Sequence, residues 1–266
     1  MLEFFPPLLD SIFVIIAGIV AGIINAIAGG GTFIAFPTLM ATGVPALVAN
    51  ATCTVGVMPG VLASTIGYRK QFAAYKRYLP ALCIIGAIGG AMGGVILMHT
   101  SNDDFKVMVP WLLLLATVVF AFGKQITNFT KRFGSDEPTK LTYIILAMLM
   151  IIVSVYGGFF GAGVGIMLLA MFQVMRLDNI HEMNALKVLV SIAIHGAGAI
   201  ALMFGDLINW SFAALLAIGT VIGGYATSKL IQGLPQYVVR GFVLFIAVAT
   251  TLYYFEKQYG IVSSII

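Results

Sequence analysis

The sequence predicts an all-α, polytopic integral membrane protein made of two tandem homologous repeats, the second of which we expect to be inverted relative to the first. Three observations support this prediction: an apolar composition, a series of long apolar runs, and a glycine pattern that occurs twice. Of the 266 residues, 61% are hydrophobic and 9% are charged, whereas soluble domains have about 25% charged residues. A soluble fold of this size would not bury so much apolar surface.

The long apolar runs provide the expected membrane spans. A transmembrane helix needs about 17–25 mostly apolar residues, and most of the runs reach this length. We therefore expect each repeat to hold four long transmembrane helices and one short helix that follows a glycine break. The eight runs cover residues 11–28, 44–67, 79–98, 107–122, 141–161, 183–204, 212–231 and 238–255.

One long polar segment, residues 124–140, divides the chain. We expect it to be a cytoplasmic linker between a first transmembrane repeat, 1–123, and a second, 141–266. A shift of 134 residues then aligns like residues of the two halves. Internal duplication is typical of secondary transporters, whose substrate site lies at the repeat interface near the midplane. The aligned pairs are Gly29 with Gly163, Gly31 with Gly165, Asn50 with Asn184, and Lys106 with Arg240.

The basic residues favour inverted repeats. If the short apolar segment 32–41 and its counterpart cross the membrane, each half has five passes, and 12 of the 14 Lys and Arg residues fall on the cytoplasmic side. If both segments are re-entrant, 9 of the 14 do. Cytoplasmic loops carry an excess of basic residues, so the five-pass, inverted arrangement fits better.

The stretch from Asn25 to Pro37 interrupts an apolar run with three consecutive glycines, Gly29, Gly30 and Gly31. Three glycines give up more helix propensity than close packing requires. Irregular backbone at membrane depth is tolerated only where it is buried or lines a cavity. The helix that follows a break has a partly positive N-terminus, which suits an anion. We therefore expect this break to form half of a substrate site, and the counterpart break with Gly163 and Gly165 to form the other half.

Lys187 is the most informative single residue. It lies in the apolar run 183–204, three residues after Asn184 and on the same helical face. A lysine near the bilayer centre costs about 2.5–3.5 kcal/mol on insertion scales, so it usually faces a cavity or a partner. The first repeat has Cys53 at this position, and one fixed cation is what a singly charged anion needs. A snorkelling lysine or a partner for Glu182 also fits.

The other candidate binding residues are polar side chains near the breaks. The amides of Asn50 and Asn184 can donate to sulfonate oxygens, or they can hydrogen-bond neighbouring helices. Thr52 adds a hydroxyl, although threonine also bonds its own helix backbone. His195 can bind the anion or carry a proton; an ordinary core histidine fits as well.

The glycine-rich break followed by Pro37, the Ala-Asn-Ala-Thr segment at residues 49–52 and the duplication together resemble the TauE/SafE sulfite exporter family, also called the toluene sulfonate uptake permeases. The resemblance implies a carrier in the plasma (bacterial inner) membrane for sulfite, sulfoacetate or another organosulfonate. The second repeat departs from the pattern, with Gly-Val-Gly at 163–165 and Met171 in place of Pro37. We therefore expect its half-site to be more helical.

These observations predict a multi-pass secondary transporter of a small sulfur-containing anion, with the proton as a candidate coupling ion. An anion channel, or a carrier for a non-sulfur organic anion, remains open, as does an oligomer. We expect no enzyme, catalytic residue, cofactor or metal site, because the three histidines are scattered and no His-Glu-x-x-His motif occurs. The net charge of +4 is too small to indicate nucleic acid; membrane lipid is the expected surrounding.

Overall fold

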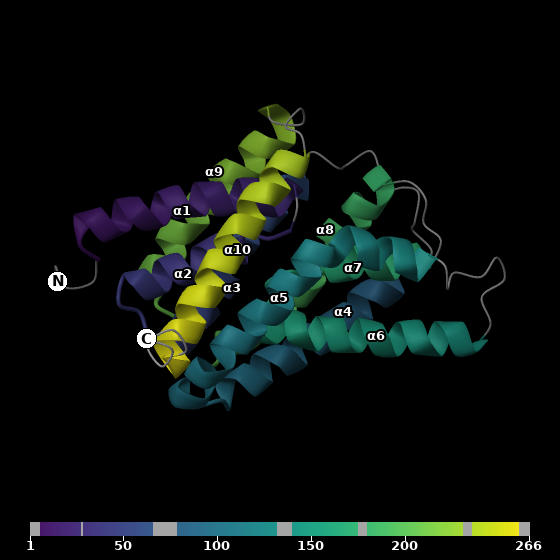
Figure 1. Cartoon of the computed structure of the whole chain (residues 1–266), viewed down its shortest axis with the longest axis horizontal. Coiled ribbons are helices and arrows are strands. Elements are labelled where there is room, and N and C mark those ends of the chain that lie inside the picture. The colour runs from purple at the N-terminus through teal and green to yellow at the C-terminus, as the bar shows by residue number, and fades with distance from the viewer. Residues whose placement is uncertain are drawn as a thin grey trace.

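The computed structural model describes residues 6–27, 29–65, 79–131, 140–174, 180–230 and 236–260. All regular secondary structure in these residues is helical, and Figure 1 shows how the helices are arranged. The helices are α1 (Leu8–Ile27), α2 (Thr32–Ala41), α3 (Ala46–Ser64), α4 (Leu79–Met98), α5 (Asn102–Lys131), α6 (Lys140–Phe159), α7 (Val164–Val174), α8 (Ile180–Leu202), α9 (Trp210–Leu230) and α10 (Gln236–Tyr259).

The prediction of an all-α, multi-pass membrane protein is confirmed. Within the described residues, six helices are long and apolar enough to cross a membrane: α1, α3, α4, and parts of α5, α8 and α9. Large apolar side chains such as Ile84, Met148 and Ile152 are exposed on the outside. A soluble protein rarely exposes so much apolar surface, and a bilayer accounts for it.

The helices α1, α3 and α9 form a first bundle. In α1, a Cβ atom on Gly18 would lie 3.1 Å from the Cα of Gly219 in α9, and one on Gly22 would lie 2.9 Å from the amide nitrogen of Gly224. The contacts advance in the same direction along both helices, so α1 and α9 run parallel. α3 packs against α9 with Gly60 against Thr220 and also runs parallel to it. Small residues allow this close approach of membrane helices.

The helices α4, α6 and α8 form a second bundle of the same kind. Gly89 of α4 contacts Ser154 of α6, and Gly93, one turn later, contacts Gly158. α8 packs against both α4 and α6, where Gly198 lies close to the backbones of Gly90 and Gly158. Each bundle therefore combines two helices from one half of the chain with one helix from the other half.

The two bundles run in opposite directions. α4 ends at Met98, and α5 begins only a short turn later, at Asn102. The side chain of Asn102 accepts a hydrogen bond from the backbone N–H of Leu47, at the start of α3 (3.2 Å). The end of α4 thus lies beside the start of α3, which makes the first and second bundles antiparallel.

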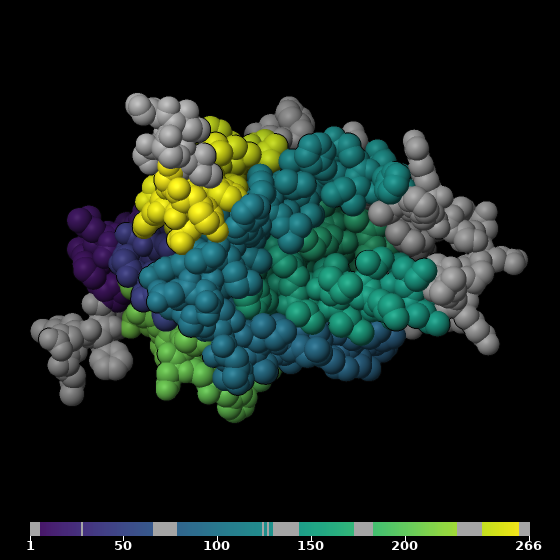
Figure 2. Space-filling model, turned by 60° about the horizontal axis from the view of Figure 1, so that its bottom comes forward, coloured from purple at the N-terminus to yellow at the C-terminus, as the bar shows by residue number. Residues whose placement is uncertain are grey.

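The helices α5 and α10 form an antiparallel pair, and Figure 2 shows α10 (yellow) beside α5 (blue to teal) on one face of the molecule. The Trp111 indole near the start of α5 donates to the Tyr259 hydroxyl at the end of α10 (3.0 Å). Further along, the hydroxyls of Thr117 and Thr251 are hydrogen-bonded at 3.0 Å. These threonines are 134 residues apart, the shift that aligns the two halves of the sequence.

The structure extends α5 beyond the apolar run 107–122 at both ends. Its start is capped by Ser101, whose hydroxyl accepts from the backbone N–H of Asp104 (3.1 Å) and donates to the Asp104 carboxylate (2.6 Å), so Ser101 acts as an N-cap residue. Its end is Lys131, so the first part of the segment expected to be a linker is helical. Residues 132–139 lie outside the described residues.

Gly93→Ala is expected to lower the thermal unfolding midpoint strongly. The new Cβ would collide with the backbone of Val155 and Gly158, and overpacking of this kind costs about 1–3 kcal/mol. Gly241→Ala in α10 is the matched control, because nothing lies within 4 Å of its Cβ position. It should be neutral or stabilising, since alanine favours helix by about 1 kcal/mol. Equal midpoints for the two variants would contradict the close packing of α4 on α6.

Candidate functional site

The first glycine break separates α1 from α2. Gly29 has a φ of +75°, a conformation that glycine adopts without steric cost. Its N–H donates to the carbonyl oxygens of Ile24 (3.2 Å) and Asn25 (3.1 Å), which satisfies acceptors at the end of α1 as in a Schellman-type cap. The chain then re-enters a helix at Thr32.

The second break separates α6 from α7 and contains two glycines with positive φ, Gly161 (+82°) and Gly163 (+78°). The Tyr156 hydroxyl donates to the carbonyl of Ala162 (2.9 Å). The Asn50 side chain of α3 donates to the carbonyl of Phe159, the last residue of α6 (2.7 Å). Our expectation that this half-site would be more helical is wrong. The two hydrogen bonds and the two glycines keep the chain non-helical between Phe159 and Val164, and neither three consecutive glycines nor a proline is needed.

The two breaks meet in the middle of the molecule. A Cβ on Gly29 would lie 3.2 Å from the Cα of Gly165, and a Cβ on Gly165 would lie 3.2 Å from the Cα of Gly29. The two backbones therefore lie in close contact, and a side chain on either residue would have to displace the other.

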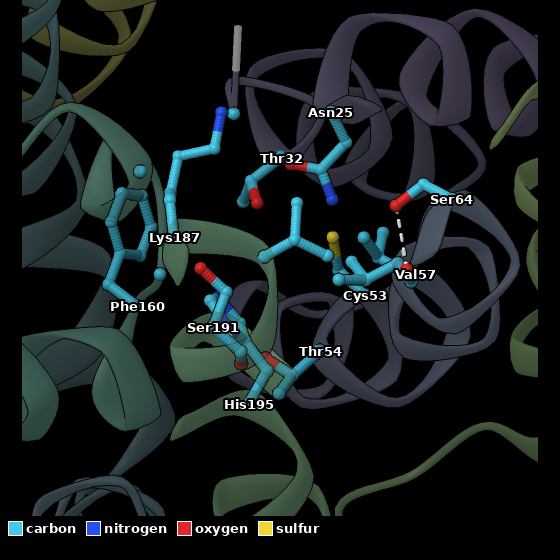
Figure 3. A pocket seen from close by; sticks show the side chains of 15 residues that line it. Asn25, Thr32, Cys53, Thr54, Val57, Ser64, Phe160, Lys187, Ser191 and His195 are labelled. Carbon is cyan, nitrogen blue, oxygen red and sulfur yellow. Dashed lines mark hydrogen bonds between the residues drawn. The ribbon is translucent and has the colours of Figure 1, made fainter. Parts of the chain in front are cut away.

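A small cavity of about 30 Å³ lies beside this contact, between the two bundles (Figure 3). The first break and α3 form one side of it, and the second break and α8 form the other. Figure 3 shows Lys187 and Asn25 on opposite sides of the space. The polar side chains that line it are Asn25, Thr32, Thr54, Ser64, Lys187, Ser191 and His195.

Lys187 is buried in this wall, with 2% of its surface exposed. Its ammonium donates to the side-chain oxygen of Asn184 (3.1 Å). Its aliphatic stem lies over the second break, where a Cβ on Gly165 would be 3.3 Å from Cδ. Among the side chains that the structure describes, no carboxylate lies within 4 Å of the ammonium. Glu182, the alternative partner, has a side chain outside this set.

His195 lies two turns after Lys187 on α8, at the end of the cavity where Figure 3 also shows Thr54. Its Nδ1 is 2.9 Å from the carbonyl oxygen of Ser191. Its Nε2 faces the second break, because a Cβ on Gly161 would lie 3.1 Å from that nitrogen.

Four of the ten predicted binding residues line the cavity: Gly29, Gly165, Lys187 and His195. The glycines Gly30, Gly31 and Gly163 lie in the breaks and pack against other parts of the protein: Gly30 against Phe120 and Val243, Gly31 against Ala21, and Gly163 near Ala116.

The remaining three predicted residues, Asn50, Thr52 and Asn184, hydrogen-bond to protein groups beside the cavity. Asn50 holds the end of α6, and its side-chain oxygen is buried without a partner. Thr52 accepts from the backbone N–H of Asn209 (3.0 Å). Asn184 binds the Lys187 ammonium. These three residues do not line the cavity themselves.

Sequence analysis did not select four polar residues that line the cavity: Asn25, Thr32, Ser64 and Ser191. Helical spacing would have found Ser191, which lies one turn after Lys187 on the same face. Asn25 lies one turn before Gly29, and Thr32 is the first residue of α2. The sequence signal that would have found Asn25 and Thr32 is a polar residue within one helical turn of a glycine break.

Comparison with known families shows which family the chain belongs to. The family model described as sulfite exporter TauE/SafE matches residues 14–254. The chain belongs to the TauE/SafE sulfite exporter family. The matched stretch includes both breaks, α3 and α8, and therefore the whole cavity. The protein is a membrane transporter.

Curated relatives of this TauE/SafE chain are also described as transporters. A "Probable membrane transporter protein" of Haemophilus influenzae is 27% identical over 236 residues, which cover 88% of this chain and 90% of the relative. One of Sinorhizobium sp, "ORF9", is 22% identical over 243 residues, 90% of each chain. The "Probable membrane transporter protein YfcA" of Escherichia coli K12 is 23% identical over 246 residues, which cover 91% of this chain and 87% of the relative. No solved structure matches the chain.

Gly29→Ala is expected to reduce transport at least tenfold. A left-handed conformation costs alanine about 1–2 kcal/mol, and the new Cβ would push Gly165 and the second break away. Gly43→Ala is the control: Gly43 has a φ of +84°, nothing lies within 4 Å of its Cβ position, and it lies outside the cavity. Uptake assays on both should show a loss for Gly29→Ala alone. An equal loss would mean that backbone strain, and not the contact of the breaks, limits transport.

Proposed function

We propose that this protein is a secondary transporter that moves a small sulfur-containing anion, such as sulfite, sulfoacetate or another organosulfonate, by alternating access. The cavity between the two bundles is the substrate site. The observation that carries this proposal is the buried Lys187 ammonium, which has a neutral amide as its hydrogen-bond partner and no carboxylate nearby in the described part of the chain. A buried charge is costly unless it is paired, and an anionic substrate would pair it.

The rest of the cavity offers what the oxygen atoms of sulfite or a sulfonate need. The hydroxyls of Thr32 and Ser191 and the amide of Asn25 can donate hydrogen bonds. Thr32 is also the first residue of α2, so the positive end of that helix lies at the cavity wall. The site thus combines one full positive charge, a helix N-terminus and neutral donors.

The arrangement of helices supports an inverted repeat. α5 and α10, which correspond under the shift of 134 residues, are antiparallel and joined through Thr117 and Thr251. Gly29 and Gly163, which correspond under the same shift, both have positive φ. Helices that correspond and run in opposite directions are the property of inverted repeats.

The moving bodies in this proposal are the two bundles. The halves of the sequence are interlocked, because α9 packs on α1 and α3, and α4 packs on α6 and α8. Movement of one half against the other would break these glycine contacts. Movement of the first bundle against the second keeps them and opens the cavity alternately to each side.

Uptake of labelled sulfite and sulfonates into proteoliposomes tests the proposed function. We expect uptake that saturates with substrate concentration, which a carrier shows, and thermal stabilisation of the purified protein by sulfite, sulfoacetate or another anionic organosulfonate. Uptake that does not saturate would indicate an anion channel. Stabilisation by carboxylates alone would indicate a carrier for a non-sulfur organic anion. If no anion is moved, the proposal is wrong.

A further inference from the structure

We propose that the site selects singly charged anions, and that residue 53 determines this charge preference. Sulfite is then carried as hydrogen sulfite, and of the candidate organosulfonates those with one negative charge are preferred over sulfoacetate, which carries two. The inference rests on the proposed function and adds the charge state of the substrate. It follows from the charges around the cavity and from the place of Cys53 in its wall.

The first step is the charge inventory of the cavity. Its titratable side chains, among the residues described, are Lys187 and His195 on α8 and Cys53 on α3. The lining residues from α1, α2 and the second break, such as Asn25, Thr32 and Phe160, carry no titratable group. The described wall contains no Asp, Glu or Arg. A site with neutral histidine and thiol therefore offers one positive charge.

The second step is the cost of a mismatch. A monoanion beside Lys187 leaves the buried site electrically neutral. A dianion leaves one uncompensated negative charge in a region of low dielectric, where charge is far more costly than in water. Neutral hydroxyl and amide donors lower this cost but do not remove it. The site therefore favours the anion with one charge.

The third step is the role of position 53. Cys53 of α3 and Lys187 of α8 correspond under the shift of 134 residues, and both line the same cavity. Figure 3 shows the Cys53 sulfur directed toward the space, on the side opposite Lys187. Cys53 has 2% of its surface exposed, so a charge placed there would share the buried environment of the substrate. A small neutral residue at this position keeps the count of cations at one.

The test compares three anions in proteoliposomes across the neutral pH range, in which hydrogen sulfite loses its proton. Methanesulfonate stays a monoanion and sulfate stays a dianion throughout. We expect sulfite uptake at constant total concentration to fall in proportion to the hydrogen sulfite fraction, methanesulfonate uptake to stay within twofold, and sulfate uptake to be at least tenfold slower. The methanesulfonate arm corrects for titration of Lys187, and the sulfate arm reports any second charge on His195.

The outcomes separate the two proposals. Uptake of sulfate as fast as methanesulfonate, or of sulfite independently of pH, would overturn the charge preference while leaving the transporter function intact. Uptake of none of the three anions would overturn both.

Variants at residue 53 test its role. Cys53→Lys should raise the ratio of sulfate to methanesulfonate uptake at least tenfold, whereas Cys53→Ser, which adds no charge, should keep the wild-type ratio. The double variant Cys53→Lys with Lys187→Cys again has one cation in the cavity and should also keep the wild-type ratio of sulfate to methanesulfonate uptake. If Cys53→Lys is as thermally stable as Cys53→Ser and its ratio does not rise, residue 53 does not set the preference. The wild-type comparison of the three anions stands even if Cys53→Lys fails to fold.

Discussion

Replacing Lys187 with methionine is expected to reduce anion uptake at least a hundredfold without loss of the folded protein. Methionine has a similar length and no charge, so it can fill the same space over Gly165. Removing one partner of a buried ion pair costs about 3–5 kcal/mol, which corresponds to a loss of about two to four orders of magnitude in binding. Uptake in proteoliposomes and binding to the detergent-solubilised protein measure this loss.

The stability of the Lys187→Met variant should not fall, and this separates a binding role from a structural one. A lysine at membrane depth costs about 2.5–3.5 kcal/mol on insertion scales, so the apolar variant should unfold at the same or a higher temperature. Lys106→Met is the control, because Lys106 is exposed and pairs with Asp103 (3.3 Å) at the start of α5. It should transport normally. If Lys187→Met keeps uptake within about threefold of wild type, the ammonium does not bind the substrate.

A cross-link between the two bundles is expected to abolish transport, whereas a cross-link within one bundle is not. Met58 of α3 and Gly196 of α8 belong to different bundles, and a Cβ on Gly196 would lie 3.0 Å from Met58 Cε. Met58→Cys with Gly196→Cys, joined by a short bifunctional thiol reagent, should hold the bundles together. Uptake should fall to background and recover when the cross-link is cleaved. The assay uses a background in which Cys53 and Cys83 are replaced by serine.

The matched control joins Met98 at the end of α4 to Gly205, in the turn after α8. A Cβ on Gly205 would lie 3.2 Å from Met98 Cε, so the geometry is similar. This pair also connects the two halves of the sequence, but Gly205 comes directly after α8, so the cross-link joins the adjacent ends of α4 and α8 within the second bundle. The Met98→Cys, Gly205→Cys cross-link should therefore be tolerated. Loss of transport with both cross-links would indicate that the sequence halves, and not the bundles, move.

The helices and the breaks were predictable from local sequence, because each depends on nearby residues. Apolar runs of sufficient length indicate membrane helices, and the glycines at 29 and 163 mark positions where φ is positive. Lys187 was also predictable as a cavity residue, since a lysine inside an apolar run needs a polar surrounding. The Ser101 cap shows why α5 begins before its apolar run.

The packing partners were not predictable, because many helices carry similar small-residue faces. Gly18 and Gly22 of α1 could pack against the glycines of α4 or of α9, and nothing local decides in favour of α9. The role of Asn50 was not predictable for the same reason. Its partner, the Phe159 carbonyl, is 109 residues away, and only the contact of α3 with the second break directs this amide to the backbone instead of the cavity.

The most direct measurement is a structure with a bound brominated alkanesulfonate, whose bromine locates the ligand by anomalous scattering. The account predicts the sulfonate in the cavity between the glycine breaks, with an oxygen at a hydrogen-bonding distance of about 2.7–3.2 Å from the Lys187 ammonium. A sulfonate bound elsewhere in the protein, with Lys187 still hydrogen-bonded to Asn184 and the cavity empty, would contradict it.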